Sequence, residues 1–532
     1  MGDGHQKFYN NLHGRFLQFS LDVKPGQSGE VADKIRYLNQ FVININPALL
    51  LLGVVYRIRE TLDFTYLFVI VFVYMGMIYY TWMLLRHTEE AKSRFYFAIS
   101  LLLLSCFLVI VHFCGNRGLI AGPFIMASYY YLREKQWLPY GIATLFGFMV
   151  SEDTAMLYMS FSLYIFIFEN KKAGLLTGMA ATLYTIIALF IIYPAARYNF
   201  NYESANHAQF YIELLKSERS IAGMFLYFIG EAKEIFAMLL SVVFLLALVG
   251  RKDINLQKLS GIIFLAPLSH WGIVFLTKSG GHHEMHILVC IYLAMVYLIA
   301  NMDFTTPFQR RQWLKMTTIA AFCLFFFVNI FLLAAQDFPY KWQLRWSLRS
   351  LIPTNPYYMK LVGQNLNDTM KSNKEFIEYV EKIPKEYTLV FLANRQVVGF
   401  ITNRPNIWSF PNYYSESDYL VIQRGARNGM FCVKDKSRIK NIVTTAELMK
   451  EVDVFQDCAV PEEFTDKLVA SLVDIDKTHK VEHISGNVVG LRRLSHIEFE
   501  QPPESLGFLF LRNVPKVLDG YLKRIQKIMN PG

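Results

Sequence analysis

The sequence predicts a polytopic α-helical membrane protein with about ten transmembrane helices, followed by a small extracytoplasmic α/β domain. Three observations support this fold class. Of 532 residues, 53% are hydrophobic and only 18% are charged, and the mean hydropathy is +0.26, which is more apolar than soluble domains usually are. Apolar runs that could cross or nearly cross a bilayer recur between residues 63 and 335. From about residue 355 onward, the composition becomes that of a soluble domain.

The chain divides into three predicted parts. Residues 1–62 form an extracytoplasmic first loop with interfacial helices, residues 63–335 the transmembrane domain, and residues 336–532 the extracytoplasmic domain. In the first part, "INPALLLLGVVYRIRETLD" is apolar for only about a dozen residues before Arg57, which favours an interfacial or re-entrant helix. The opening stretch "MGDGHQKFYNNLHGRFLQFS" has no apolar core of a signal peptide. We therefore expect a first helix to come from sequence upstream of Met1, or alternatively from a partner chain.

The predicted transmembrane segments differ in length, and several are short. Short apolar segments are typical of helices that are broken or shielded by neighbours around a cavity. The segments are 64–85, 95–114, 118–132, 138–150, 154–168, 175–193, 235–249, 261–276, 287–300 and 316–335.

Charge in alternate loops predicts the orientation. The net charge of +10 lies in short clusters between apolar runs, so we attribute it to topology and contact with anionic lipid, and not to nucleic-acid binding. The basic loops, which are expected in the cytoplasm, contain Arg86, Lys92 and Arg94; Arg133 and Lys135; Lys171 and Lys172; Arg251, Lys252 and Lys258; and Arg310, Arg311 and Lys315. The loops 115–117, 151–153, 194–234 and 278–286 are then expected outside. This distribution indicates a multi-pass membrane protein whose C-terminal domain lies outside the cytoplasm.

The C-terminal part combines strand-like and helix-like patterns. "YTLVFLAN", "NIWSF", "DYLVIQR" and "NVVGLRRL" are typical of strands, and "NKEFIEYVEKI" and "AELMKEV" of helices. Cys432 and Cys458 could form a disulfide outside the cytoplasm or remain as free thiols. The last segment, "VPKVLDGYLKRIQKIM", predicts an amphipathic helix that lies against this domain or against the membrane.

An acidic pair is the first candidate for chemistry. Glu152 and Asp153 lie between two apolar runs with no basic neighbour in sequence. Ionisable groups at membrane depth are costly and often functional. The pair is either the solvated tip of a helical hairpin or a catalytic carboxylate pair at the rim of a cavity, where it could also bind a cation.

A histidine cluster precedes one of the late apolar segments. "GHHEMH" contains His282, His283, Glu284 and His286. The zinc-protease motif needs H-E-x-x-H, and this segment has H-E-x-H, so a site of that kind is excluded. His282 and His286 have the i, i+4 spacing of one helix face, but two ligands do not make a zinc site. Metal binding, phosphate binding or general-base chemistry, and interfacial packing all remain open.

Three cations lie at the predicted outer ends of helices, against the usual charge distribution. Arg117, Arg197 and Lys278 could bind the phosphate of a lipid-linked substrate or extend toward lipid headgroups. Asp3 is an early acidic candidate, provided that its loop is tied to a preceding helix.

Several segments together resemble a known family. "FYNNLHGRFLQFS", "NPALLLLGVVYRI", "SEDTAMLYMSFSLYIF", "HHEMHILVCIYLAMVYLIA" and "IPKEYTLVFLANRQVVGFITNRPNIWSFPNYYSESDYLVIQ" follow in the order of a prokaryotic family of predicted membrane proteins of unknown function. That family is similar to the GT-C polytopic glycosyltransferases. The residues of the last segment that match best are Pro384, Arg404, Pro411, Asp418 and Tyr419.

The resemblance implies a GT-C-like fold in a prokaryotic cytoplasmic (inner) membrane. It also implies an inverting transferase that takes a sugar from a polyprenyl-phosphate donor to an extracytoplasmic acceptor. It gives Asp3 the role of the acidic residue of the first outer loop, and it matches Glu152 and Asp153 to the acidic pair of the family. A divalent cation, Mg²⁺ or Mn²⁺, could assist. The implied substrate-binding residues are Arg117, Arg197, Lys278, His282, His283, His286 and Arg404.

One departure from the family pattern keeps other functions open. A histidine is expected shortly before Pro47, where this chain has Asn44 and Asn46. The first alternative is therefore a catalytically degenerate, GT-C-like scaffold subunit of a membrane or envelope complex. A transporter is the weaker alternative, because we find no inverted repeat of interrupted helices.

Overall fold

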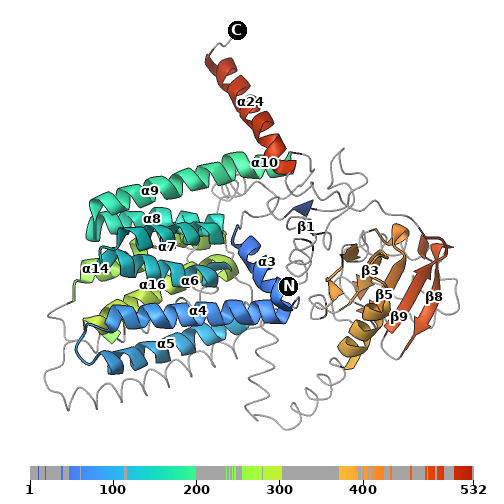
Figure 1. Ribbon diagram of the computed structural model, residues 1–532, viewed down its shortest axis with the longest axis horizontal. Helices are drawn as coiled ribbons and strands as arrows, with labels where there is room; N and C mark the ends of the chain where they lie inside the picture. The colour runs from blue at the N-terminus through green and yellow to red at the C-terminus, as the bar shows by residue number, and fades with distance from the viewer. Residues whose placement is uncertain are drawn as a thin grey trace.

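The computed structural model describes a helical body, a small mixed sheet and a C-terminal helix (Figure 1). The described residues are mainly 47–59, 62–112, 117–198, 254–277, 280–301, 371–393, 401–423, 474–496 and 509–529, with short gaps and a few isolated positions. The first part contributes helix α3 (Ala48–Arg59) and a two-residue pairing of β1 (Gln18–Phe19) with β2 (Leu38–Asn39). Helix α3 coincides with the short apolar segment that predicted a helix before Arg57.

The helices of the body run up and down, so that their connections alternate between two ends. Helices α6 and α7 pack together along the chain, as do α8 and α9, and Figure 1 shows the body from the side. The helices are α4 (Leu62–Leu85), α5 (Ala91–His112), α6 (Arg117–Arg133), α7 (Trp137–Val150), α8 (Glu152–Phe168), α9 (Lys171–Ile186), the π-helical η1 (Ile187–Ile192), α10 (Tyr193–Arg197), α14 (Leu256–Ser260), the π-helical η2 (Gly261–Leu265), α15 (Leu268–Thr277) and α16 (Gly280–Ala300).

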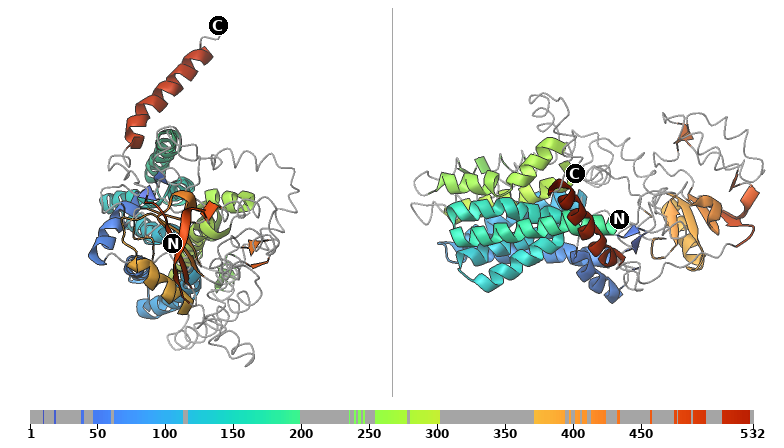
Figure 2. Two further views of the ribbon diagram at one scale, coloured as in Figure 1. Left: turned by 90° about the vertical axis from the view of Figure 1, so that its right-hand side faces the viewer. Right: turned by 90° about the horizontal axis from the view of Figure 1, so that it is seen from above.

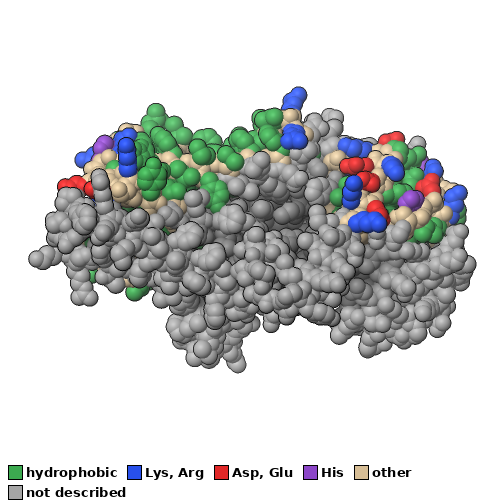
Figure 3. All heavy atoms as spheres, turned by 90° about the horizontal axis from the view of Figure 1, so that it is seen from below, with side chains coloured by type: hydrophobic (Ala, Val, Ile, Leu, Met, Phe, Trp, Pro, Cys, Tyr) green, Lys and Arg blue, Asp and Glu red, His purple; other side chains and the backbone are tan. Residues whose placement is uncertain are grey.

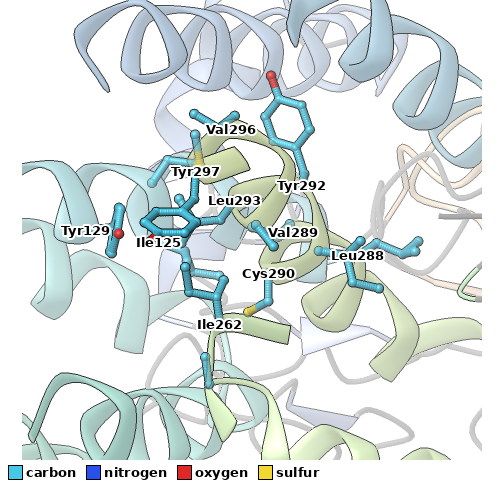
Figure 4. Packing of buried hydrophobic residues seen from close by; sticks show 14 of the residues in the cluster. Ile125, Tyr129, Ile262, Leu288, Val289, Cys290, Tyr292, Leu293, Val296 and Tyr297 are labelled. Carbon is cyan, nitrogen blue, oxygen red and sulfur yellow. The ribbon is translucent and has the colours of Figure 1, made fainter. Parts of the chain in front are cut away.

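Helix α16 forms the centre of the core. Every residue from Ile287 to Ile299 is buried, so this helix is enclosed on all sides by protein. Figure 4 shows its side chains packed against Ile125 and Tyr129 of α6 and Ile262 of η2. A helix that is apolar around its whole circumference is expected in such a position.

The predicted helix positions are largely right, but the prediction of ten transmembrane helices is wrong. Among the described residues, one continuous helix, Lys171–Arg197, is long and apolar enough to cross a membrane. Four other apolar helices are shorter: Val71–Leu85, Trp137–Val150, Leu256–Leu265 and His286–Ala300. The apolar residues of α16 are buried against other helices, and hydropathy alone does not distinguish such a helix from one that faces lipid. The predicted segments 235–249, apart from isolated positions, and 316–335 lie outside the described residues.

Basic residues that predicted membrane topology hold helix ends in the structure. Arg94 is buried and donates hydrogen bonds to the carbonyl oxygens of Ile299 and Ala300, at 2.6 and 2.8 Å. It therefore caps the C-terminus of α16, where a positive charge is favourable. Lys258 forms a 2.7 Å ion pair with Glu169 at the end of α8. Their positive charge thus has a local structural use that does not depend on a bilayer.

Close packing of α8 against α9 depends on a glycine. The Asn170 side chain caps α9 by accepting a hydrogen bond from the Ala173 amide at 3.0 Å. In the next position, Gly174 lies directly against the backbone of Phe166, and an added Cβ would be 2.5 Å from its amide nitrogen and 2.6 Å from its Cα. Because backbone atoms cannot rotate away, the two helices would have to separate to admit a side chain.

We expect Gly174→Ala to lower the free energy of unfolding by about 1–3 kcal/mol, although alanine favours a helix. Gly141 in α7 is the matched control, because an added Cβ there would have no heavy atom within 4 Å. Gly141→Ala should raise the free energy of unfolding by up to about 1 kcal/mol. Denaturant titration of the full chain compares the two variants. Equal effects of the two substitutions would contradict the packing described here.

The C-terminal domain is a five-stranded mixed sheet in the order β4-β3-β5-β9-β8. Strand β3 is parallel to both β4 and β5, and β9 is antiparallel to β5 and β8. The strands are β3 (Leu389–Leu392), β4 (Ile407–Ser409), β5 (Tyr419–Gln423), β8 (His479–Ile484) and β9 (Val488–Arg493). A helix over residues 371–382 contributes Phe376 and Val380 to the core of this domain.

Four of the five strands were predicted from sequence, as was the helix before them. The fifth strand, β8, was missed because "HKVEHI" alternates buried and accessible residues at the edge of the sheet, which leaves few apolar residues in a run. Strand β6 (Cys432–Val433) pairs in parallel with β7 (Gln456–Asp457). Cys458 and the predicted helix "AELMKEV" lie outside the described residues.

Burial of His479 predicts a loss of stability in acid. Burial lowers the pKa of His479 below its ordinary 6.5, and nearby Arg493 adds to this, while a hydrogen bond to the Ser417 carbonyl oxygen and the carboxylates of Asp474 and Asp418 oppose it. The unfolded chain therefore takes up a proton at a higher pH than the folded chain does. Stability should fall as the pH drops below about 6.5 and level off once folded His479 is also protonated.

Hydrogen exchange of β8 and β9 in the full chain, measured between about pH 7.5 and pH 5 and corrected for intrinsic rates, tests this expectation. In His479→Gln the pH dependence should be smaller. His496→Gln is the control for the other nearby histidine. An unchanged pH dependence in His479→Gln would contradict the assignment.

Candidate functional site

The loops predicted to share one side of the protein gather at one end of the helical body. Helix α7 ends at Val150, α8 begins at Glu152, and α16 begins at Gly280 at the same end (Figure 1). Helices α8 and α16 are linked there by a buried hydrogen bond of 3.0 Å between Thr154 Oγ1 and His286 Nε2. The structure thus brings the neighbourhood of the acidic pair to the last histidine of "GHHEMH", 132 positions away in sequence.

A line of hydroxyls and imidazoles extends from this hydrogen bond into the body. Ser151 Oγ lies 3.0 Å from Thr154 Oγ1, and the rings of His286 and His270 lie 4.3 Å apart between centroids. Beyond them, Ser269 Oγ is 3.1 Å from His270 Nδ1. We call these five residues the hydroxyl–imidazole path. Imidazoles and hydroxyls can both donate and accept hydrogen bonds, so this path can orient a reacting group.

The acidic pair occupies the first turn of α8. The Ser151 side chain caps this helix by accepting a hydrogen bond from the Thr154 amide at 3.2 Å. Glu152 is buried and Asp153 is partly exposed, and Glu152 interacts electrostatically with the phenol of Tyr184 in α9. The positive end of the helix dipole stabilises carboxylates in this turn. Two acids on one turn therefore have different environments, which is a common basis for different chemical roles.

Two predicted phosphate-binding residues lie away from this cluster. Arg197 packs over the Tyr193 ring at 4.3 Å in α10, about 20 Å along the helix from Tyr184 at 1.5 Å per residue. Arg404 is buried in the C-terminal domain, and its guanidinium donates to the carbonyl oxygens of Val380 and Ile383, both at 2.8 Å. It closes the end of helix 371–382, so the structure gives it a structural use.

The remaining predicted site residues are described only in part or not at all. Arg117 is the first residue of α6, at the same end of the body as Glu152, and His282 and His283 lie in the first turn of α16. The side chains of these three residues lie outside the described part, as do Asp3 and Lys278 altogether. Their predicted roles stay predictions.

Sequence reasoning missed His270 and Ser269. Both lie in the middle of the apolar run 261–276, away from the charged residues at its ends. His270 is fully buried against His286. An ionisable residue inside an apolar helix is itself a signal for a polar cluster, and "LSHWG" carried that signal.

The predicted divalent cation stays a prediction. Within the described ranges, no three His, Cys, Asp or Glu side chains gather closely enough to hold a metal ion. Mg²⁺ is usually bound by one or two carboxylates together with substrate phosphates, and Glu152 and Asp153 are the residues that would hold it in this way. We assign no chemical step to a metal.

The comparisons with known proteins leave this site as the main guide to function. No protein-family model matches the chain, and no curated protein or solved structure is significantly similar to it.

Proposed function

We propose that the protein transfers a sugar from a polyprenyl-phosphate donor to a hydroxyl group of an acceptor. The single observation that carries the proposal is the Thr154–His286 hydrogen bond, because it joins the first turns of α8, where the acidic pair lies, to a buried histidine of α16 that is distant in sequence. Polar clusters inside an apolar helical body are costly and are usually retained for function.

In the proposed reaction Glu152 is the general base. Its carboxylate accepts the proton of the acceptor hydroxyl while the acceptor oxygen forms a bond to the anomeric carbon of the sugar. The bond between that carbon and the phosphate oxygen breaks, and polyprenyl phosphate leaves with the electron pair. Attack from the face opposite the phosphate inverts the anomeric configuration. The Thr154–His286 pair orients the first turn of α8 beside the reacting groups.

The lipid part of the substrate needs an apolar surface. Helix Lys171–Arg197 meets the length and composition of a membrane-crossing helix, and only 22% of its most apolar window is buried. Its exposed side chains include Leu175, Leu176, Met179 and Leu183. This helix packs directly on α8, so a polyprenyl chain along it would reach the acidic pair.

A transfer assay tests the proposal. The full chain is purified in detergent and incubated with polyprenyl-phosphate sugars that carry a radiolabel in the sugar, together with a mixture of lipid and glycan acceptors. Release of polyprenyl phosphate with transfer of the label is the expected result. Donor binding without any transfer would contradict catalysis and favour a scaffold subunit, and the absence of donor binding would contradict both.

A further inference from the structure

The C-terminal helix α24 (Leu509–Met529) leaves the rest of the molecule. Figures 1 and 2 show it rooted at α10 and running away from the body, steeply inclined to the axis of α9. Its root is fixed by a hydrogen bond from the buried Asn513 side chain to the Ala195 carbonyl oxygen at 3.2 Å. The ammonium of Lys516 lies over the Tyr198 ring at 5.3 Å. From Asn513 to the end of the helix, about 24 Å of helix projects outward.

The projecting part of α24 has two chemically different faces. Apolar residues recur at spacings of three and four, which places them on one side of the helix. They are Leu511, Val514, Leu518, Leu522, Ile525 and Met529, and all except Val514 are large exposed hydrophobic residues. Met529 is 73% exposed and neighbouring Ile528 is 77% exposed. A continuous apolar face of this kind needs a partner to cover it.

The opposite face is strongly basic. Arg512, Lys516, Lys523 and Arg524 lie on it or at its edges, and all are exposed. The acidic residue among them, Asp519, already forms a 2.7 Å ion pair with Lys523. An apolar face with flanking lysine and arginine matches an anionic bilayer surface, where the apolar residues enter the acyl region and the cations meet lipid phosphates.

The position of α24 relative to the α9–α10 helix points to the same partner. Lys171–Arg197 is the described helix that can cross a bilayer, and at 27 residues it is about 40 Å long, compared with a hydrocarbon core of about 30 Å. Helix α24 is anchored at the C-terminal end of Lys171–Arg197, beside Arg197 and Tyr198. Arginine and tyrosine are typical of the membrane–water interface. If Lys171–Arg197 crosses the bilayer, a helix that leaves this end at a steep angle would lie along that interface.

The other described surfaces carry different chemistry. In Figure 3 hydrophobic side chains gather over the helical body, whereas Lys, Arg, Asp and Glu are mixed over the C-terminal sheet domain. The predominantly basic face of α24 beside an apolar face therefore distinguishes it from the sheet domain.

We propose that α24 binds the surface of an anionic lipid bilayer as an interfacial helix, with its apolar face in the membrane. The inference does not depend on sugar transfer, since an inactive protein would bind in the same way.

Photocrosslinking in the full chain tests the proposal. A benzophenone amino acid replaces Ile525 on the apolar face, or Lys523 on the basic face as the matched control. The protein is mixed with vesicles of phosphatidylcholine alone or with added phosphatidylglycerol, irradiated, floated and analysed for adducts by mass spectrometry. We expect lipid adducts from position 525 in the anionic vesicles, with at least about tenfold fewer from position 523 or in neutral vesicles.

Three results would overturn the proposal. Adducts of position 525 with this chain or with a second copy would show that protein covers the apolar face. Equal yields of lipid adducts in neutral and anionic vesicles would show that the basic face does not contribute to binding. Failure of the protein to float with anionic vesicles would show that it does not bind the membrane. As a second variant, Lys523→Glu with Arg524→Glu should lower the adduct yield of position 525 by at least about tenfold, because both residues are exposed and their replacement leaves the apolar face and the root of α24 intact.

Discussion

Replacing Glu152 by glutamine is expected to lower the rate of sugar transfer by about 10²–10⁴-fold, the usual contribution of a general base. Glutamine has nearly the same shape as glutamate but cannot accept the acceptor proton. Glu152 is buried at the start of α8, so the isosteric change should preserve packing. Binding of the donor should be nearly unchanged, because the proposed base contacts the acceptor hydroxyl and not the phosphate.

Asp153 provides the matched control for this prediction. It carries the same charge, lies on the same helical turn, and is partly exposed. Asp153→Asn should therefore change the turnover much less than Glu152→Gln. Initial rates at saturating donor and acceptor measure both variants. If the two substitutions reduced turnover equally, the effect would come from the negative charge at the helix N-terminus, and Glu152 would have no separate role as a base.

A third variant separates catalysis from the orientation of α8. Thr154→Val keeps the volume of the side chain but removes the hydroxyl that lies 3.0 Å from His286 Nε2. If the hydroxyl–imidazole path positions α8, the turnover should fall while the pH profile of the reaction keeps its shape. A shift of that profile would instead indicate that His286 itself exchanges a proton during the reaction.

Much of the secondary structure could be predicted because local patterns determine it. The predicted segment 138–150 differs by one residue from α7, and the strand pattern "DYLVIQR" contains β5. Apolar runs between capping residues and turns, such as Ser151 and Asn170, predict helix ends well. The error lay in the environment assigned to the helices, because apolar helices were all predicted to face lipid. Helix α16 and the exposed helix Lys171–Arg197 are similarly apolar, but they differ in what covers them.

The candidate site was predictable only where a charge interrupted an apolar run. Glu152 and Asp153 stand out in sequence for that reason, and so does His286. The contact of His286 with His270 depends on how α15 packs against α16, and one sequence does not contain that information. For Arg404, the sequence predicted a site residue where the structure shows a structural contact. The family resemblance suggested that Arg404 binds substrate, whereas its guanidinium donates hydrogen bonds to the carbonyl oxygens of Val380, Ile383 and Pro384 at the end of a helix.

Asp418→Ala is expected to destabilise the C-terminal sheet by about 2–6 kcal/mol, because two buried donors lose their acceptor at about 1–3 kcal/mol each. Asp418 Oδ2 accepts hydrogen bonds from the amide and the hydroxyl of Thr388, both at 2.8 Å. Its own amide donates to Thr388 Oγ1 at 2.7 Å. Thr388 and Asp418 are both buried and directly precede the parallel strands β3 and β5. The pair therefore sets the register at which these two strands begin.

Two further variants resolve the contributions of the partners of Asp418. The other carboxylate oxygen lies 2.6 Å from His496 Nδ1, but the His496 side chain is 52% exposed, so His496→Gln should cost at most about 1 kcal/mol. Thr388→Val removes the hydroxyl and keeps the amide donor, and its effect should lie between the other two. Hydrogen exchange of the β3 and β5 amides in the full chain gives the free energy of local opening. If His496→Gln were as harmful as Asp418→Ala, the exposed His496 contact would stabilise the sheet, and the buried Thr388 bonds would not. The predicted order instead follows from burial, because water can take the place of His496 beside Asp418 but has no access to the donors of Thr388.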